Sequence, residues 1–460
     1  MSSEWPHVRL ADFVEIKHGW PFKSEFFLTG DESPSLPIVV AIGNFDYGGG
    51  FRFGSTKINR YADKYPDEYR LEADDLLLVM TCQTAGGEIL GIPGRIPRNG
   101  RTYLHNQRLG KVVLKRPDAS KAFLYWLFLW KEFNKHLVDS ATGTKILHTA
   151  PKRIESFRFA LPPLAAQDRI AALLDSLDDR IALLRETNAT LEAIAQALFK
   201  SWFVDFDPVR AKSQGLAPAG MDEATVALFP GSFEESALGS VPKGWECIDL
   251  AELTKRFGGS IQTGPFGSQL HASDYVKSGV PVVMPKDIVN RRASTESVAR
   301  IGTTDADRLS RHKLQAGDIV FSRRGDVERH ALITEREVGW ICGTGCLLLR
   351  SGPQWKSPGF LSMLLDAPRA RTWLVQHAVG ATMPNLNTGI LGSVPVVLPS
   401  PPVLRAFEVL VSVTEDQRSR NASMAETLAT LRDTLLPRLI SGQLRLPLAQ
   451  EAIAEAPYAD

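Results

Sequence analysis

Residues 161–203 read LPPLAAQDRIAALLDSLDDRIALLRETNATLEAIAQALFKSWF. After Pro163, no Gly or Pro interrupts this stretch, and apolar side chains recur in steps of four and three residues. The seam consists of Ile170, Leu174, Leu177, Ile181, Leu184, Asn188, Leu191, Ala195, Leu198 and Trp202. About five heptads of this pattern predict a helix on the order of 50 Å long. Because one amphipathic helix of that length cannot bury its own seam, it needs a partner.

A second copy of the pattern supplies that partner. Leu161-Pro162 recurs as Leu398-Pro399, and the steps of four and three residues then return. The second seam consists of Phe407, Leu410, Thr414, Gln417, Asn421, Met424, Leu428, Leu431 and Leu435, and it precedes Pro437. If the two helices run antiparallel with their ends flush, so that Ile170 lies near Leu439, Asn188 lies opposite Asn421. A polar pair at the centre of an apolar seam is expected to fix the register of the helices.

The repeat extends to the blocks that precede each helix. Trp245-x4-Leu250 echoes Trp5-x4-Leu10, and Leu314-x-Ala-x-Asp318 echoes Leu71-x-Ala-x-Asp75. Short apolar runs between Gly and Pro residues in these blocks predict strands. The predicted fold is therefore α+β: two mixed α/β domains joined by two long helices that form an antiparallel coiled coil, with an internal pseudo-twofold repeat.

The composition shifts along the chain give the domain boundaries. We expect domains at residues 1–160 and 244–397, spacer helices at 161–204 and 398–442, and a tail at 443–460. Residues 205–243 are rich in Pro, Gly, Ala and Ser, which predicts a linker with one short helical turn.

Composition and charge narrow the class of protein. The chain has 460 residues, a hydrophobic fraction of 44% and a net charge of +1. It has no signal-peptide pattern and no apolar run long enough to span a bilayer, so a cytoplasmic location without membrane contact is expected. Each of the two blocks carries four more Lys and Arg than Asp and Glu, whereas the remaining segments are acidic. This asymmetry favours blocks that bind an anionic partner.

Motifs for catalysis are missing from the sequence. It contains no Gly-x4-Gly-Lys-Ser/Thr loop, no methyltransferase catalytic turn and no Pro-Asp followed by an acidic-x-Lys strand. Residues 89–117, in contrast, contain seven basic residues and no acidic one, with Asn and Gln interleaved. Arg and Lys neutralise phosphates, and Arg, Asn and Gln can bind base edges. The chain is predicted to bind nucleic acid and not to be an enzyme.

Five motifs resemble the DNA-specificity (S) subunit of type I restriction–modification systems. They are residues 161–164 (LPPL), 203–212 (FVDFDPVRAK), 261–270 (IQTGPFGSQL), 317–325 (GDIVFSRRG) and 380–387 (GATMPNLN). The resemblance covers essentially the whole chain. It implies two target-recognition domains, each recognising half of a bipartite asymmetric site in double-stranded DNA. It also implies that the helices set the gap between the half-sites.

The resemblance further implies the partners. The family's subunit has no catalytic activity and assembles with two methyltransferase (M) subunits and, in the full complex, two restriction (R) subunits. Adenine methylation and ATP-dependent DNA cleavage, with S-adenosylmethionine, ATP and Mg²⁺, belong to those partners. No cofactor is expected on this chain.

The candidate DNA-binding residues come from the basic clusters and the family motifs. Residues 143–148 (GTKILH) stand where the second block has 380–385 (GATMPN), so the two blocks should recognise different sequences. The candidates are Arg95, Arg98, Arg101, Asn106, Gln107, Arg108, Lys145, Gln262, Ser268, Arg323, Arg324 and Arg329.

Three alternatives remain open from the sequence. The first is a recognition subunit of a related system in which cleavage and methylation share one polypeptide. The second is a self-contained nuclease with an unrecognised site. The third is a coiled-coil interaction protein that does not bind DNA, for which no salt-dependent retention on DNA is expected.

Overall fold

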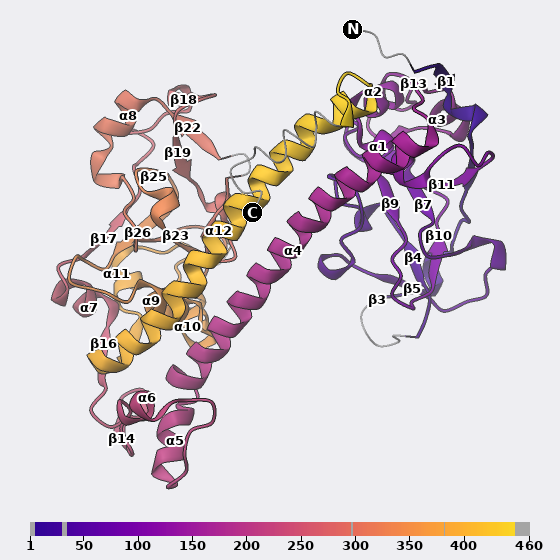
Figure 1. The fold of residues 1–460 in the computed structure, drawn as a ribbon. Coiled ribbons are helices and arrows are strands. Elements are labelled where there is room, and N and C mark those ends of the chain that lie inside the picture. The colour runs from indigo at the N-terminus through magenta and orange to yellow at the C-terminus, as the bar shows by residue number, and fades with distance from the viewer. Residues whose placement is uncertain (1–4, 30–34, 296–297, 381, 447–460) are drawn as a thin grey trace. The chain divides into compact units, whose positions relative to one another are not determined.

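A computed structural model describes residues 5–29, 35–295, 298–380 and 382–446 (Figure 1). The chain divides into two compact units. Unit 1 comprises Met1–Leu184 and Met424–Asp460, and unit 2 comprises Arg185–Ser423. Of the predicted tail, residues 447–460 lie outside the described residues. Each unit contains mixed sheets and one portion of each of two long helices, which gives the chain an α+β fold.

Unit 1 is built on two main sheets. An antiparallel sheet has the strand order β2 (Val14–His18), β11 (Leu109–Leu114), β7 (Leu76–Val79) and β9 (Pro93–Arg95). The other has the order β3 (Phe27–Thr29), β5 (Asn59–Tyr61), β4 (Ile38–Val40), β10 (Tyr103–His105) and β6 (Arg70–Leu71), with β4 and β10 parallel. All four side chains of β7 are buried, as expected for a strand covered on both faces.

Unit 2 repeats the order of the antiparallel sheet and of the first four strands of the second sheet. The antiparallel sheet runs β17 (Ser260–Thr263), β26 (Cys346–Arg350), β23 (Ile319–Ser322) and β24 (His330–Leu332). The second sheet runs β18 (Tyr275–Val276), β22 (Ala299–Ile301), β19 (Val280–Val283) and β25 (Ile341–Cys342), and β19 and β25 are again parallel. Strand β17 therefore takes the place of β2, β26 that of β11, and β23 that of β7.

Short helices and one strand pair complete each unit. In unit 1, β1 (His7–Arg9) pairs with β13 (Arg158–Ala160), and in unit 2, β16 (Glu246–Asp249) pairs with β27 (Pro395–Leu398). The helices of unit 1 are α1 (Lys121–Leu129), α2 (Lys131–Asp139) and α3 (Pro151–Glu155). Those of unit 2 include α7 (Leu250–Arg256), α8 (Thr303–Arg308), α9 (Pro358–Asp366), α10 (Pro368–His377) and α11 (Thr388–Gly392).

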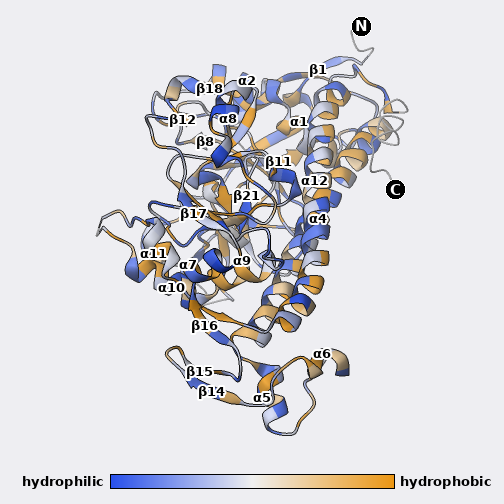
Figure 2. Cartoon of the chain, turned by 90° about the vertical axis from the view of Figure 1, so that its left-hand side faces the viewer, coloured by the Kyte–Doolittle hydropathy of each residue, from blue (hydrophilic) through white to orange (hydrophobic). Residues whose placement is uncertain are grey.

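The long helices are α4 (Leu164–Phe203) and α12 (Pro401–Ile440), and α12 continues past Pro437. In unit 1, Ile181 and Leu184 of α4 form an apolar cluster with Ala425 of α12. In unit 2, Phe203 packs against Phe407 with ring centroids 4.8 Å apart. Figure 2 shows hydrophobic and hydrophilic residues interspersed along both helices, as expected for helices with one buried face.

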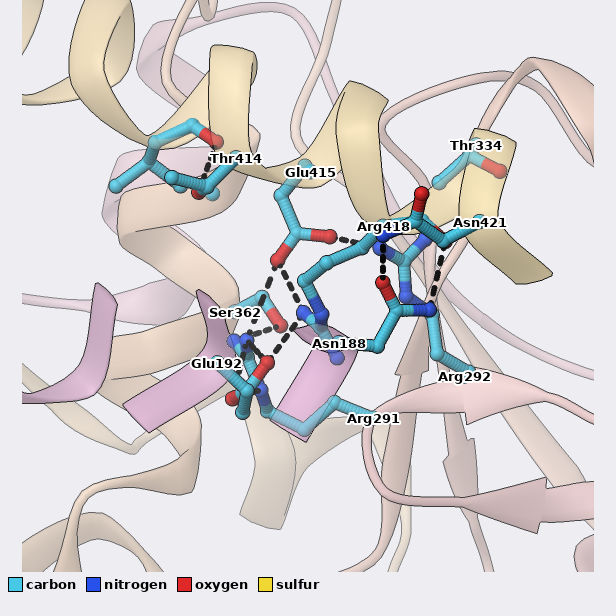
Figure 3. Close-up of polar contacts among 12 residues, drawn as sticks. Asn188, Glu192, Arg291, Arg292, Thr334, Ser362, Thr414, Glu415, Arg418 and Asn421 are labelled. Carbon is cyan, nitrogen blue, oxygen red and sulfur yellow. Dashed lines mark hydrogen bonds and ion pairs between the residues drawn. The ribbon is translucent and has the colours of Figure 1, made fainter. Parts of the chain in front are cut away.

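A hydrogen-bonded asparagine pair joins α4 and α12 in unit 2 (Figure 3). Nδ2 of Asn421 donates to Oδ1 of Asn188 at 2.9 Å, and Nδ2 of Asn188 donates to the carbonyl oxygen of Arg418 at 3.0 Å. Within this unit, higher residue numbers in α4 meet lower numbers in α12, since Phe203 contacts Phe407. The two helical portions of unit 2 are therefore antiparallel.

The β20–β21 hairpin of unit 2, between Ile288 and Ala293, is attached to the long helices by charges (Figure 3). Arg291 lies in the hairpin turn with φ +60 and is 7% exposed. Its guanidinium forms an ion pair of 2.8 Å with Glu192 of α4 and one of 3.5 Å with Glu415 of α12. It also donates to the hydroxyl of Ser362 at 3.1 Å. One side chain thus connects a sheet element to both helices.

Unit 1 attaches its sheets to α4 differently. The buried amide of Gln167 accepts from the backbone N–H of Ser120 at 2.9 Å. It donates to the carbonyl oxygens of Asp118 and Pro162 at 3.0 and 2.9 Å. Asp175 of α4 forms a 3.1 Å ion pair with Arg95, and both side chains are about one-third exposed.

The segment 205–243 is more ordered than the predicted linker. It contains α5 (Asp207–Ser213), α6 (Glu223–Ala227) and a hairpin of β14 (Phe233–Ser236) and β15 (Gly239–Pro242). The physical reason is burial: Phe229 is 2% exposed and packs edge-on against Trp202, at 5.0 Å between ring centroids. No helix in the described ranges of the chain is long and apolar enough to cross a membrane.

Candidate nucleic-acid interface

Three loops of unit 2 meet at one end of its antiparallel sheet, around an open cleft of about 300 Å³. One loop follows β17, the second follows β23, and the third is the turn before β26. The residues that line the cleft are Pro265, Phe266, Gly267, Arg323, Arg324, Thr344 and Gly345. The cleft therefore combines cationic, aromatic and hydroxyl groups.

Backbone contacts hold the loops of unit 2 together. The N–H of Arg323 donates to the carbonyl oxygen of Gly345 at 2.8 Å, and the N–H of Leu386 donates to that of Arg323 at 2.9 Å. A side chain at Gly264 would overlap the carbonyl oxygen of Gly343. Glycine at position 264 is thus required for the close approach of the loop after β17 to the turn before β26.

The exposed side chains at this end of unit 2 include both a cation and apolar groups. Phe266 is 57% exposed and Met383 is 61% exposed. Arg323 donates from Nε to the carbonyl oxygen of Leu386 at 3.3 Å, which fixes its position. Arg324 is exposed, and among the described residues its guanidinium has no hydrogen-bond or ion-pair partner. This arginine is available to an anionic or hydrogen-bonding ligand.

Unit 1 has the same backbone arrangement at the corresponding sheet end. The N–H of Met80 donates to the carbonyl oxygen of Arg108 at 3.0 Å, and the N–H of Thr149 donates to that of Met80 at 3.0 Å. A side chain at Gly19 would overlap the carbonyl oxygen of Asn106. These contacts correspond one for one to those of Arg323, Leu386 and Gly264 in unit 2.

The glycine loops also correspond. In unit 1, Thr142 and His148 exchange two backbone hydrogen bonds, and in unit 2, Val379 and Asn385 do the same. Gly143 and Gly380 have φ of +104 and +110, a region that favours glycine. The exposed tip contains Lys145 and Ile146 in unit 1, and Met383 in unit 2.

Comparison with known proteins fits this arrangement. Residues 2–193 match the family described as "Type I restriction modification DNA specificity domain". The chain is 26% identical over 404 residues to the type I restriction enzyme HindI specificity subunit of Haemophilus influenzae, covering 76% of this chain and 84% of that protein. It is 22% identical to the EcoBI specificity subunit of Escherichia coli, over 96% of this chain and 86% of that protein.

Over most of its length the chain is similar to type I restriction enzyme specificity subunits, and its residues 2–193 match the DNA specificity domain of type I restriction modification. The fold agrees: the crystal structure of an S subunit from M. genitalium superposes with a TM-score of 0.55 at 15% identity, covering 95% of this chain and 96% of that one.

Several of the residues predicted to bind DNA lie at these sheet ends. In unit 1, Asn106, Gln107 and Arg108 form the turn between β10 and β11, and Lys145 lies at the tip of the glycine loop. Oδ1 of Asn106 accepts from the N–H of Arg108 at 3.0 Å and so shapes the turn. In unit 2, the predicted residues Arg323 and Arg324 line the cleft, and Ser268 lies in the segment that follows β17.

The other predicted residues have partners within the protein or lie elsewhere. Arg95 pairs with Asp175 and lies over the ring of Tyr125, so it contributes to the attachment of α4. Arg98 pairs with Asp74, and Arg329 pairs with Asp326 at 2.8 Å. Gln262 donates to the carbonyl oxygen of Arg311 at 2.8 Å. Arg101 is exposed in the loop before β10.

The aromatic residues of the loops after β2 and β17 were missed in the sequence. Trp20 and Phe22 of unit 1 follow Gly19 just as Phe266 follows Gly264 in unit 2. Trp20 forms an isolated bridge with Asn106, and its ring lies 5.0 Å from that of Phe22. The signal was present as a shared Ile-x-x-Gly followed by Pro-Phe, at residues 16–22 and 261–266.

Proposed function

We propose that this chain is the non-catalytic DNA-recognition subunit of a type I restriction–modification complex and recognises a bipartite asymmetric site. The observation that carries the proposal is the loop arrangement at one sheet end in each unit. The backbone contacts are the same in both units, whereas the side chains at the exposed positions differ. Two copies of one arrangement with different side chains are suited to two different half-sites.

In this proposal, residues 1–160 and 244–397 are the target-recognition domains. Helices α4 and α12 form an antiparallel coiled coil whose length sets the unrecognised gap between the half-sites. The Asn188–Asn421 pair fixes the register of the coiled coil, because an unpaired amide in an apolar seam would cost free energy in any shifted register.

We further propose that two methyltransferase subunits dock on the long helices and that two restriction subunits complete the complex. Apolar side chains on the exposed faces of the helices support this docking: Ile194 of α4 is 56% exposed, and Val409 and Val413 of α12 are 66% and 67% exposed. S-adenosylmethionine, ATP and Mg²⁺ would be bound by those partners, which would supply adenine methylation and ATP-dependent cleavage.

A block exchange tests the proposal. The chain is expressed with its methyltransferase partner, and adenine methylation is mapped across the genome of the host. We expect one bipartite motif. Replacing residues 244–397 with the corresponding block of another specificity subunit should change one half of the motif and leave the other half and the gap unaltered.

Two results would contradict the proposal. One is a change in both halves of the motif, which would exclude independent recognition by the two blocks. The other is cleavage of plasmid by the purified chain with Mg²⁺ alone, which would favour a nuclease. A chain without its methyltransferase partner serves as the control for background methylation.

A further inference from the structure

We infer that Arg324 of unit 2 and Arg108 of unit 1 are specificity-determining residues with the same role, and that each binds the major-groove edge of a guanine. The two arginines lie on opposite walls of the loop arrangement that the units share. This inference rests on the proposed function and adds the base recognised and the side chains that recognise it. The walls are the strand end, after β7 or β23, and the turn, before β11 or β26.

The strand register makes the two units comparable residue by residue. Val79 pairs with Leu109 at the end of β7 and β11, and Ser322 pairs with Cys346 at the end of β23 and β26. The next residue of the strand end is Met80 in unit 1 and Arg323 in unit 2. The last residue of the turn is Arg108 in unit 1 and Gly345 in unit 2.

The exposed arginine lies on a different wall in each unit. At the strand end, unit 2 has Arg324 where unit 1 has Thr81, which is 6% exposed and hydrogen-bonded to Nδ1 of His148 at 3.1 Å. In the turn, unit 1 has Arg108 where unit 2 has Gly345, which has no side chain. Each unit therefore places one such arginine at its sheet end, on the strand-end wall in unit 2 and on the turn wall in unit 1.

Both arginines are free to bind a ligand. Arg108 and Arg324 are exposed, and neither guanidinium has a hydrogen-bond or ion-pair partner in the part of the chain that the structure describes. The neighbouring Arg329 differs, because it is paired with Asp326. A free guanidinium on a short, hydrogen-bonded loop can donate two parallel hydrogen bonds to O6 and N7 of guanine, the commonest specific contact of arginine with DNA.

An aromatic group beside Arg324 supports a base as the ligand rather than a phosphate alone. Phe266 is 57% exposed and lines the cleft with Arg324. In unit 1, Trp20 bridges through its backbone to Asn106 of the turn that contains Arg108, and its ring packs against other aromatic rings of the unit. Apolar faces of this kind can contact a thymine methyl group or an adjacent base. A site for phosphate alone needs no such surface.

The test is selection of bound duplexes from a randomised pool by the full-length chain. Arg324→Lys, Arg108→Lys and the matched control Arg329→Lys are compared with the unaltered chain. Lysine retains the charge but cannot form the two parallel hydrogen bonds. Circular dichroism melting verifies that each variant is folded.

We expect Arg324→Lys to lose a guanine preference at one position of one half-site, and Arg108→Lys to lose one in the other half-site. Affinity for the selected duplex should fall about ten- to hundred-fold in each case, while affinity for random DNA is retained. Arg329→Lys should behave like the unaltered chain.

Three outcomes would overturn the inference. In the first, Arg324→Lys or Arg108→Lys retains the full sequence preference. In the second, both variants change the same half-site. In the third, alanine at either position weakens binding to all sequences equally, which indicates a phosphate contact. A different result separates the proposed function from this inference: if the unaltered chain selects no sequence at all, the recognition role itself is wrong.

Discussion

The two units attach their sheets to the long helices with groups of different polarity. Unit 1 uses the neutral amide of Gln167 and an ion pair, Arg95–Asp175, whose side chains are 33% and 31% exposed. Unit 2 uses Arg291, which is 7% exposed, between Glu192 and Glu415. The difference shows that the strand order does not dictate how the helices are held. We therefore expect the attachment of unit 1 to tolerate the loss of a charge and that of unit 2 to depend on its charges.

The charges of unit 2 stabilise one another only as a group. Burial opposes ionisation of Glu192, but Arg291 and Arg418 outweigh it and hold the pKa of the carboxyl below its ordinary value. Burial also lowers the pKa of Arg292, although Glu415 opposes this effect. The cluster contains the guanidinium groups of Arg291, Arg292 and Arg418 and the carboxylates of Glu192 and Glu415. Removing any member except Arg292 therefore breaks more than one buried ion pair.

The largest expected effect is therefore that of Arg291→Ala. It removes the ion pairs of Arg291 with Glu192 and Glu415 and its hydrogen bond to Ser362, although Arg418 and Arg292 still face the two carboxylates. The free energy of unfolding should fall by about 3 kcal/mol. Arg95→Ala, the matched control in unit 1, breaks a pair whose side chains are about one-third exposed and should cost about 1 kcal/mol or less. Urea unfolding of the full chain measures both losses.

Hydrogen exchange locates the effect of Arg291→Ala. Peptides that span β20 and β21 should lose protection in the variant, while those of β7 in unit 1 should not. Equal losses of stability in Arg291→Ala and Arg95→Ala would show that the two attachments do not differ in this way.

A smaller effect is expected from Gln167→Leu. The leucine has a similar size but leaves the N–H of Ser120 and the carbonyl oxygens of Asp118 and Pro162 without this partner. Because unsatisfied buried groups each cost about 1–3 kcal/mol and water can reach some of them, we expect a loss of about 2–3 kcal/mol. Gln214→Leu, at an exposed position, is the control and should have little effect. If hydrogen exchange at the start of α1 is unchanged in Gln167→Leu, the amide does not hold this attachment.

The long helices could be predicted from the sequence because their pattern is local. The four-and-three spacing placed Asn188 and Asn421 in the seam, and the observed helices end within a few residues of the predicted limits. The segment 205–243 was underestimated because its order depends on Phe229, which packs on Trp202 of another element. The amino-acid composition of a segment predicts whether it resembles a linker, but it does not indicate the surface on which the segment packs.

The attachments and the free arginines could not be predicted, for a related reason. Arg95 and Arg324 both appear in basic clusters, yet Arg95 pairs with Asp175, eighty residues along the chain, and Arg324 is unpaired. Which arginine is neutralised depends on strand register and on the helix facing it. The repeated Gly and Pro-Phe of the loops after β2 and β17 was the one local signal of the sheet ends.

The smallest predicted effect is a dependence of stability on pH, which we expect for unit 2 and not for unit 1. Burial raises the pKa of Glu408 to about 7, although the N–H groups of Gly359 and Phe360 donate to its carboxylate. The corresponding residue of α4 in unit 1 is Ala171, which cannot titrate. Because the folded chain retains this proton while the unfolded chain releases it near pH 4.5, stability should fall as the pH rises from about 5 to 8.

Glu408→Gln should remove this component of the pH dependence. The expected change is about 1–2 kcal/mol between pH 5 and 8, less than the full pKa difference implies because the side chain is only half-buried. Urea unfolding at several pH values measures it, and exchange protection of α9 should follow the same pH course. If the variant and the unaltered chain lose stability in parallel as the pH rises, the titrating group lies elsewhere. The attachment of unit 2 would then depend on pH no more than that of unit 1.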